Sequence, residues 1–225
     1  MKISGALLLL VCAVAAQPTK WTKIRPQPLN SASDNGRIIG GEFTNPGDIP
    51  YQAGVIIDGN ALCGGSLIND FAVLTSARCV VGGASFEVHL GATNIYDLTE
   101  ANHIQATSSD TIVHELYDAV NDVNDIAIIY LPILVSGPGI APVRLPTRSF
   151  DGFDLTGLTV RASGWGKGDT GGPLVLFEGD GNPTLVGVTS SGSDQGCEAG
   201  DPAIFTRVSV HLDWISLNTG IVILP

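Results

Sequence analysis

Short apolar runs separated by turn-forming residues fill the chain from residue 38 to the C-terminus. Each run is bounded by Gly, Pro, Asn or Asp, which is typical of antiparallel strands joined by tight turns. The runs cover residues 53–57, 66–75, 86–90, 126–131, 158–162, 174–177, 185–189 and 203–207. Their lengths and spacing predict an all-β protein built as a barrel or a sandwich.

Only the tail of the chain carries helical spacing. Between residues 210 and 218, Leu212, Ile215 and Leu217 recur among polar residues with helix-like spacing. We therefore expect one C-terminal helix. The sequence contains no internal repeat and no low-complexity tract.

The N-terminal 37 residues differ in composition from the rest. Lys2, an apolar run over residues 6–14 and the small pair Ala15 and Ala16 are typical of a secretory signal peptide, and the run is too short to span a bilayer. Residues 17–37 are polar and rich in proline, so we expect an extended, accessible segment that ends in Arg37, where a protease could cut. These features predict a soluble, secreted protein.

The charge of the chain excludes one class of function. The full sequence has 11 basic and 22 acidic residues, a net charge of −11, but residues 38–225 hold only 6 of the bases and 21 of the acids. A body so acidic repels phosphate backbones, so we expect no nucleic-acid partner. The simplest interpretation of the acidic residues is a solvated surface.

The cysteine count is odd once the signal peptide is removed. Of the four cysteines, Cys12 lies in that peptide, which leaves Cys63, Cys79 and Cys197. Cys63 and Cys79 can pair in an oxidising compartment. Cys197 would then form an intermolecular disulfide or remain a free thiol.

Several segments, found in family order, resemble the trypsin and chymotrypsin-like serine proteases, including the chymotrypsin-like enzymes of arthropods. They correspond to the activation site, the region of the catalytic His, the segment of the catalytic Asp, a Gly-Trp-Gly segment, the nucleophile loop and the strand before the final helix. These are residues 37–41, 63–79, 124–127, 163–166, 168–174 and 205–208.

The resemblance implies a double antiparallel β-barrel with a C-terminal helix. It divides the chain into a signal peptide (1–16), a propeptide (17–37) and a protease domain (38–225), with a first barrel over 38–142 and a second over 143–225. It implies no cofactor and no metal.

Two of the three catalytic positions implied by the resemblance carry the wrong residue. Asp125 matches, but Arg78 stands where the family has His and Thr170 where it has Ser. The mechanism needs an imidazole to take the proton of the serine hydroxyl and a buried carboxylate to orient that imidazole. A guanidinium stays protonated and cannot act as a base, so we expect Arg78 to pair with Asp125 instead.

The nucleophile position is altered more mildly. Thr170 keeps a hydroxyl, but its methyl group restricts χ1 and crowds the approach of a substrate carbonyl. The implied oxyanion hole consists of the backbone N–H groups of Gly168 and Thr170. His89, His103, His114 and His211 lie in other segments, and we expect none of them to replace the missing base.

A segment of the second barrel is missing. Only three residues separate Trp165 from Asp169, whereas the family has some tens of residues there. The missing piece would supply the pocket floor, several strands and the partner of Cys197. What remains of the implied pocket is one wall, Ser190, Ser191 and Gly192. Loss of adjacent strands predicts unpaired edges and exposed apolar faces.

The implied activation machinery is retained. Cleavage after Arg37 would free the ammonium group of Ile38 to pair with Asp169. This pair either still controls the conformation of the site or is inherited without use.

These observations predict a secreted serine protease homologue without peptidase activity. Its partner would be an extracellular protein or peptide, such as a protease or a protease inhibitor, besides the protease that cuts at Arg37; neither a membrane nor a nucleic acid is expected. The alternative is an active secreted digestive endopeptidase made as a zymogen. A third interpretation is a degenerate product without a stable fold.

Overall fold

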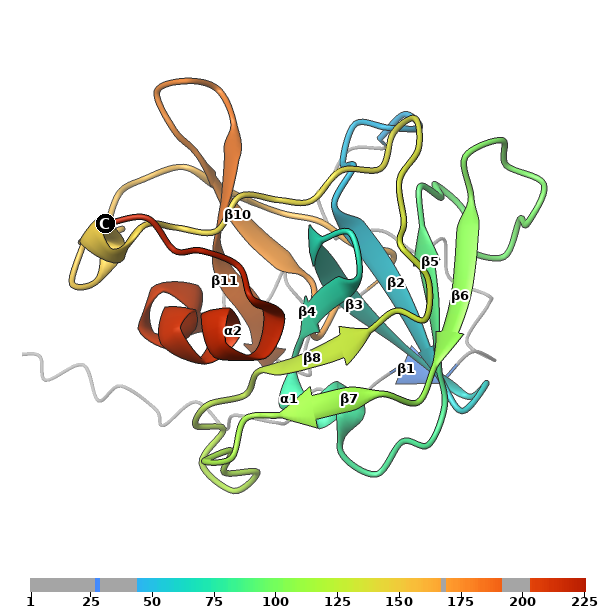
Figure 1. The fold of residues 1–225 in the computed structure, drawn as a ribbon, viewed down its shortest axis with the longest axis horizontal. Helices are drawn as coiled ribbons and strands as arrows, with labels where there is room; N and C mark the ends of the chain where they lie inside the picture. The colour runs from blue at the N-terminus through green and yellow to red at the C-terminus, as the bar shows by residue number, and fades with distance from the viewer. Residues whose placement is uncertain (1–26, 29–43, 167–168, 192–202) are drawn as a thin grey trace, which may run out of the picture.

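The computed structural model of this chain describes residues 27–28, 44–166, 169–191 and 203–225 (Figure 1). These residues form two antiparallel sheets and a short C-terminal helix, so the all-β prediction is confirmed. None of the described helices is long and apolar enough to cross a bilayer.

The first sheet has eight strands and curls on itself. Seven of them follow the order β6-β5-β2-β3-β4-β8-β7, and β1 pairs with β3 outside this path. In chain order the strands are β1 (Gln27–Pro28), β2 (Gln52–Ile57), β3 (Ala61–Asn69), β4 (Ala72–Thr75), β5 (Phe86–Leu90), β6 (Ile104–Ser108), β7 (Thr111–Val113) and β8 (Ala127–Tyr130). The side chains inside the curl form one core, which includes the fully buried Val55, Leu67 and Val88.

The second sheet has four described strands in the order β12-β11-β10-β9. They are β9 (Val160–Ala162), β10 (Pro173–Phe177), β11 (Pro183–Ser191) and β12 (Ile204–Arg207). A 3-10 turn, η3 (Val208–His211), leads into the helix α2 (Leu212–Thr219), which ends at Gly220 in the left-handed region with φ 72°. Figure 1 shows α2 beside β10 and β11.

A second core joins the two sheets. It contains Leu74 and Ile128 from the first sheet, Leu185 from the second, and Ile215 from α2. Two short elements complete the described structure, α1 (Ala77–Val80) and the 3-10 helix η1 (Arg148–Phe150).

Most predicted strands are found within a few residues of their predicted bounds, and the helix predicted at 210–218 lies at 212–219. One strand prediction is wrong: the run 66–75 is a hairpin of β3 and β4. The chain turns at Asp70 and Phe71, where the N–H of Phe71 donates to the side-chain oxygen of Asn69 at 3.0 Å. Such side-chain turns compete locally with a continuous strand.

The end of the second sheet at β9 exposes apolar surface. All three β9 residues are exposed, and among the described residues β9 pairs with β10 alone. The side chain of Phe177 on β10 is 40% exposed, and the guanidinium carbon of Arg161 lies 4.6 Å from the centre of its ring. The exposed edge expected from the missing segment is present.

Candidate active site

The structure brings together Arg78, Asp125 and Thr170. Arg78 lies on α1 directly after β4, Asp125 lies just before β8, and Thr170 lies just before β10. The predicted disulfide between Cys63 and Cys79 is present and ties α1 to β3. The three segments therefore meet where the two sheets face each other.

Arg78 binds both oxygens of the Asp125 carboxylate. Its backbone N–H donates to Oδ1 at 2.9 Å, and its side-chain Nε–H donates to Oδ2 at 3.2 Å. The Arg78 side chain is 9% exposed and that of Asp125 is fully buried. The pairing expected from the sequence is confirmed.

Asp122 is a member of the site that the sequence analysis missed. Nη2 of Arg78 donates to Oδ1 of Asp122 at 2.5 Å, so one guanidinium bridges two carboxylates. Asp122 and Asn124 both have a positive φ, 56° and 53°. Asp and Asn tolerate this backbone region better than other non-glycine residues. The available signal was an Asp three residues before Asp125, with Asn124, a residue type that suits such a turn, between the two.

The Asp125 carboxylate has a third donor. Ser190, predicted as part of the pocket wall, lies at the end of β11 and donates its hydroxyl to Oδ2 at 2.7 Å. Thr206 of β12 donates to the backbone carbonyl of Asp125 at 2.8 Å. Burial, followed by the charge of Asp125, raises the pKa of the neighbouring Tyr117. The site holds two carboxylates and one guanidinium, which makes it net anionic.

Thr170 is enclosed by the first sheet. The residue is 2% exposed, and its carbonyl accepts the N–H of Gly64 on β3 at 2.8 Å. The next residue, Gly171, has φ 86° and lies against the side chain of Thr75 and the carbonyl of Gly64. Glycine suits this position because a side chain has neither the backbone freedom nor the space.

Asp169 lies in the loop before β10 without a described cationic partner. Its carboxylate accepts the N–H of Gly166 at 2.9 Å and 3.1 Å, and it lies where a side chain at Gly164 would point. Burial raises the pKa of Asp169 to about 7, although these backbone hydrogen bonds oppose the shift. The carboxyl group is therefore poorly stabilised as an anion in this arrangement.

Several predicted site residues fall outside the described residues. These are Gly168 of the oxyanion hole, Gly192 of the pocket wall, the activation residues Arg37 and Ile38, and Cys197. Ser191, the other member of the pocket wall, is buried at the end of β11.

The four histidines form two pairs of rings. His89 and His103 lie 5.0 Å apart between ring centres, and His114 and His211 lie at the same separation. Nδ1 of His89 also lies 2.8 Å from Nε2 of His103, within hydrogen-bond distance.

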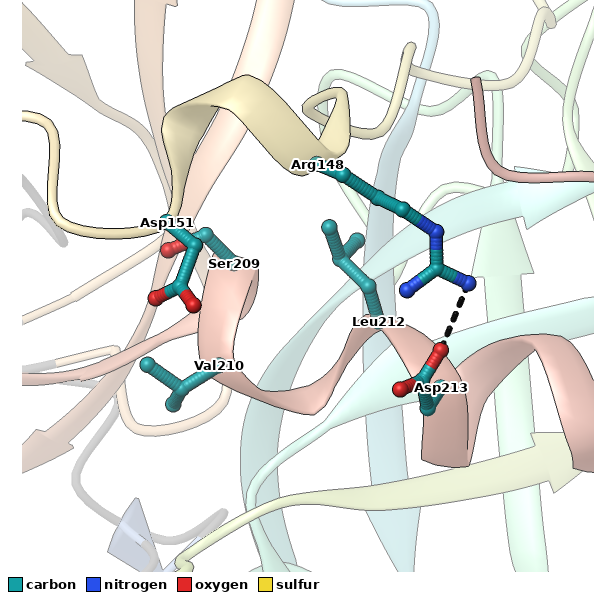
Figure 2. A pocket seen from close by; sticks show the side chains of 6 residues that line it. All are labelled: Arg148, Asp151, Ser209, Val210, Leu212 and Asp213. Atoms are coloured by element: carbon teal, nitrogen blue, oxygen red, sulfur yellow. Dashed lines mark ion pairs between the residues drawn. The ribbon is translucent and has the colours of Figure 1, made fainter. Parts of the chain in front are cut away.

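A surface hollow of roughly 390 Å³ lies between η1 and the C-terminal helices (Figure 2). It is lined by Arg148, Asp151, Ser209, Val210, Leu212 and Asp213. Nη2 of Arg148 and Oδ1 of Asp213 form an ion pair of 2.6 Å across it. None of the residues implied by the sequence motifs lines this hollow.

Comparison with known proteins assigns the chain to a family. A family model described as trypsin matches residues 38–168 and 167–215. Serine protease 1 of Drosophila melanogaster is 33% identical and covers 88% of this chain and 91% of its own length. Brachyurin of Leptuca pugilator is 34% identical, with 82% of this chain and 99% of its own length covered. The solved structure of HL collagenase superposes with a TM-score of 0.72 at 30% identity, over 81% of this chain and 98% of its own.

The alignments also bear on the missing segment. For serine protease 1, 88% of 225 residues is about 198, so about 50 of the 248 aligned positions have no residue in this chain. The two ranges that match the family model meet at residues 167 and 168, where the sequence predicts the missing piece. The family model matches most of the chain and the solved structure superposes on it, so this chain belongs to the trypsin family of serine proteases and has the chymotrypsin-like fold.

Proposed function

We propose that this chain is a secreted serine protease homologue without peptidase activity, which acts by binding an extracellular protein or peptide such as a protease or a protease inhibitor. The observation that supports the proposal is the Arg78 guanidinium, which bridges Asp122 and Asp125 at the position where the resemblance implies the general base. A permanently protonated group in this place has no capacity to accept a proton.

The contacts of Asp125 support a structural role for the substituted pair. In the family mechanism the carboxylate orients an imidazole and stabilises its charged form. Here the same carboxylate receives two hydrogen bonds from Arg78 and one from Ser190. These three hydrogen bonds stabilise an ion pair between Arg78 and Asp125. None of them orients a group that could accept a proton.

The burial of Thr170 supports the loss of the nucleophile. Attack on a peptide carbonyl requires the hydroxyl to reach a substrate atom at about 3 Å, yet Thr170 is 2% exposed. Loss of the base or the nucleophile costs about 10⁶ in turnover in a serine protease of similar chemistry. That corresponds to about 8 kcal/mol of barrier.

The second candidate is an active secreted endopeptidase. It is favoured by the retained environment of Asp125, which still receives the hydroxyls of Ser190 and Thr206, and by the hydroxyl of Thr170. Several relatives carry the names of proteolytic enzymes, among them collagenase of Hypoderma lineatum, which is 31% identical.

A peptidase assay separates the two. The protein is purified, cut after Arg37 and incubated with a mixed peptide library, with an active trypsin-family enzyme assayed in parallel. We expect no cleavage by this chain. Cleavage that is lost in a Thr170→Ala variant would establish the endopeptidase instead.

A reconstruction tests the reason for inactivity. The double variant Arg78→His, Thr170→Ser restores the residue types of the catalytic mechanism in the present scaffold. We expect it to remain inactive because about 50 aligned positions of the relatives are missing here. Recovered activity would show that the two substitutions alone account for the loss.

Secretion is part of the proposal and has its own measurement. It is supported by the signal-peptide features of residues 1–16 and by the Cys63–Cys79 disulfide, a bond that persists in oxidising compartments. Expression of the full sequence in insect cells, followed by N-terminal sequencing of protein from the medium, should find a chain that begins near Gln17. Retention of the whole product inside the cells would contradict this part.

A further inference from the structure

We propose that two copies of this chain join through their four-stranded second sheets, so that β9 of each copy pairs with β12 of the other. The two sheets then close into one eight-stranded antiparallel barrel. Each place where β9 of one copy meets β12 of the other is called a seam below. The occupant of the open side of the sheet is thus a second copy of the chain, whether or not the protein cleaves peptides.

The first observation is that both outer strands of the second sheet have a free side. Among the described residues, β9 pairs only with β10 and β12 only with β11. The free side of a strand presents N–H and C=O groups that readily pair with another strand. The two ranges that match the family model meet at residues 167 and 168, a few residues after β9 ends. The edge is therefore free where the relatives have about 50 additional aligned positions.

The second observation is the direction of the strands. Each of the three neighbouring pairs in the order β12-β11-β10-β9 is antiparallel, so β9 and β12 run in opposite directions. A two-fold axis along the strands keeps the direction of every strand. It therefore brings β9 of one copy antiparallel to β12 of the other, at both seams. Such an interface is self-complementary, as a two-fold dimer requires, and side chains can fill the interior of an eight-stranded barrel.

The third observation is an apolar sheet face that belongs to neither described core. Val175 on β10 contributes to the core between the two sheets. Side chains alternate along a strand, so its neighbours Leu174 and Leu176 point to the opposite face. Val160 and Ala162 of β9 pair with these two leucines and share their face. This face of the sheet, called the inner face below, lies outside both cores.

The inner face reaches from one free edge to the other. A side chain at Gly187 on β11 would contact both Leu174 and Phe205, which places Phe205 of β12 on the inner face. At the other edge, Val160 is 37% exposed. Closing the barrel buries the inner faces of the two copies against each other and removes apolar surface from water.

The inner face also fixes the register of the seams. With Val160 opposite Phe205 of the second copy, Arg161 lies opposite Ile204 and Ala162 opposite Ala203. Val160 and Ala162 then remain inside the barrel, and Arg161 remains outside. A shift by one residue would turn Arg161 into the barrel. A cross-strand pair of an aromatic and a β-branched side chain is also a favourable one.

Pairing of β9 with β9 is the other symmetric arrangement, and two arguments disfavour it. In the centred register it places Arg161 opposite Arg161 of the second copy, and like charges directly opposite each other are destabilising. It also pairs a strand of only three residues and leaves the inner faces uncovered. A stable interface buries about 800 Å² on each partner, so a closure with two seams and two inner faces fits better.

The charge of the chain predicts how salt affects the dimer. Residues 38–225 hold 6 basic and 21 acidic residues, so two copies repel each other at a distance. Neither β9 nor β12 contains an acidic residue, and each contains one arginine. Apolar contact and main-chain hydrogen bonds therefore hold the seams. Added salt screens the repulsion, so it should strengthen the association.

The test measures the association of the secreted chain by sedimentation velocity from about 1 to 100 μM, a range that covers micromolar dissociation constants. Cys197 is replaced by Ser in all forms, which excludes a disulfide between copies. Val160→Lys places a charge on the inner face at the seam, a device that edge strands use against pairing. Leu217→Lys is the matched control, because Leu217 lies on α2 and is 84% exposed.

We expect a dimer for the parent protein and for Leu217→Lys, and a dissociation constant at least about tenfold higher for Val160→Lys. The dimer should tighten as salt is added. A monomer at all concentrations would overturn the proposal, as would a dimer that Val160→Lys leaves unchanged. Weaker association at higher salt would contradict an apolar seam.

A second pair of variants tests which strands meet. Ile204 is 39% exposed and lies opposite Arg161 of the second copy in the proposed register. Ile204→Glu should therefore dimerise at least about tenfold more tightly than Ile204→Lys, since each of the two seams gains an opposite charge in one variant and a like charge in the other. The acidity of the whole chain acts in the reverse direction, because the added glutamate increases the repulsion between copies.

Equal dissociation constants for Ile204→Glu and Ile204→Lys would overturn the pairing of β9 with β12, because β12 takes no part in a pairing of β9 with β9. Tighter association of Ile204→Lys would overturn it as well. The result of the peptidase assay changes neither outcome, since the seams use no residue of the candidate active site.

Discussion

Arg78 binds the carboxylate of Asp125 with both its backbone and its side chain, at 2.9 Å and 3.2 Å. Because Asp125 is fully buried, the guanidinium compensates a charge that has no access to water. The Arg78 guanidinium therefore repairs what would otherwise be an unpaired buried charge at Asp125.

The first prediction tests this repair. Arg78→Ala leaves Asp125 buried and uncompensated, which costs about 3 to 5 kcal/mol. The double variant Arg78→Ala, Asp125→Ala removes both charges and should unfold at a higher temperature than the single variant. Thermal midpoints of the wild type and these variants decide the point, and equal losses in the single and double variants would contradict a compensating role.

A variant of Asp122 is the control for the comparison of these single and double variants. It also pairs with Arg78, but its side chain is 20% exposed and solvent screens its charge. Asp122→Asn should therefore cost only about 1 kcal/mol or less. A loss as large as that of Arg78→Ala would show that Asp122, not Asp125, is the essential partner of the guanidinium.

The second prediction concerns Asp169 in the uncut protein. Its pKa in the folded state is raised to about 7 from a usual value of 3.8, so ionisation opposes folding. Asp169→Asn should leave stability unchanged near pH 4 and raise it progressively up to about pH 7, by at most about 4 kcal/mol. Urea denaturation at pH 4, 6 and 8 measures this.

Asp151→Asn, which removes an exposed carboxylate next to η1, is measured in parallel as the control. Cleavage at Arg37 extends the test. If the freed Ile38 ammonium pairs with Asp169, the advantage of Asp169→Asn at pH 8 should reverse in the cut protein. A persistent advantage would mean that the activation pair is inherited without use.

The third prediction concerns His211. Burial, followed by the charge of His114, lowers the pKa of His211 to about 4. The folded state therefore binds its proton less readily than the unfolded state does. Stability that is present above pH 6.5 should fall by about 3 kcal/mol as the pH drops to 4. His211→Gln should flatten that fall in a series of thermal midpoints.

His114→Gln distinguishes the two causes. It removes the charge that faces His211 at 5.0 Å but leaves the burial of the ring, so it should flatten the acid fall less than His211→Gln does. A steeper acid fall in His211→Gln than in the wild type would refute the assignment of this titration to His211.

The sequence predicted the parts of the fold that depend on hydrophobic runs between turn residues, and the parts of the site that depend on fixed motifs. It missed β6 and β7 because it relied on continuous apolar runs, which Gln105, Thr107 and Thr111 interrupt, although residues 104–107 alternate between apolar and polar as in a half-buried strand. These strands pair with β5 and β8. Strand formation of this kind depends on tertiary context more than on local propensity.

Prediction of the site from the sequence was limited in the same way. The pairing of Arg78 with Asp125 followed from the motifs, but the bridge to Asp122 depends on a loop with two positive φ angles. The low exposure of Thr170 depends on how the nucleophile loop packs against β3, a contact between residues about 100 positions apart in sequence. No pattern of neighbouring residues encodes such distances.

The last prediction tests that packing through Gly171. Its φ of 86° is unfavourable for any L side chain, and its missing side chain leaves room for Thr75 and for the carbonyl of Gly64. Gly82 has the same φ of 86° but no neighbour within 4 Å of the position that a Cβ would occupy. Gly82→Ala should therefore cost only the backbone strain, about 1 to 2 kcal/mol.

Gly171→Ala should cost about 1 to 3 kcal/mol more than Gly82→Ala, because the added methyl group must displace the nucleophile loop from β3 and β4. Urea denaturation of the two variants gives the difference, and amide exchange at Gly64, whose N–H donates to Thr170, shows whether the loop has moved. Equal losses with an unchanged Gly64 amide would mean that the loop does not pack against the first sheet as described, and that Thr170 is more accessible than its 2% exposure indicates.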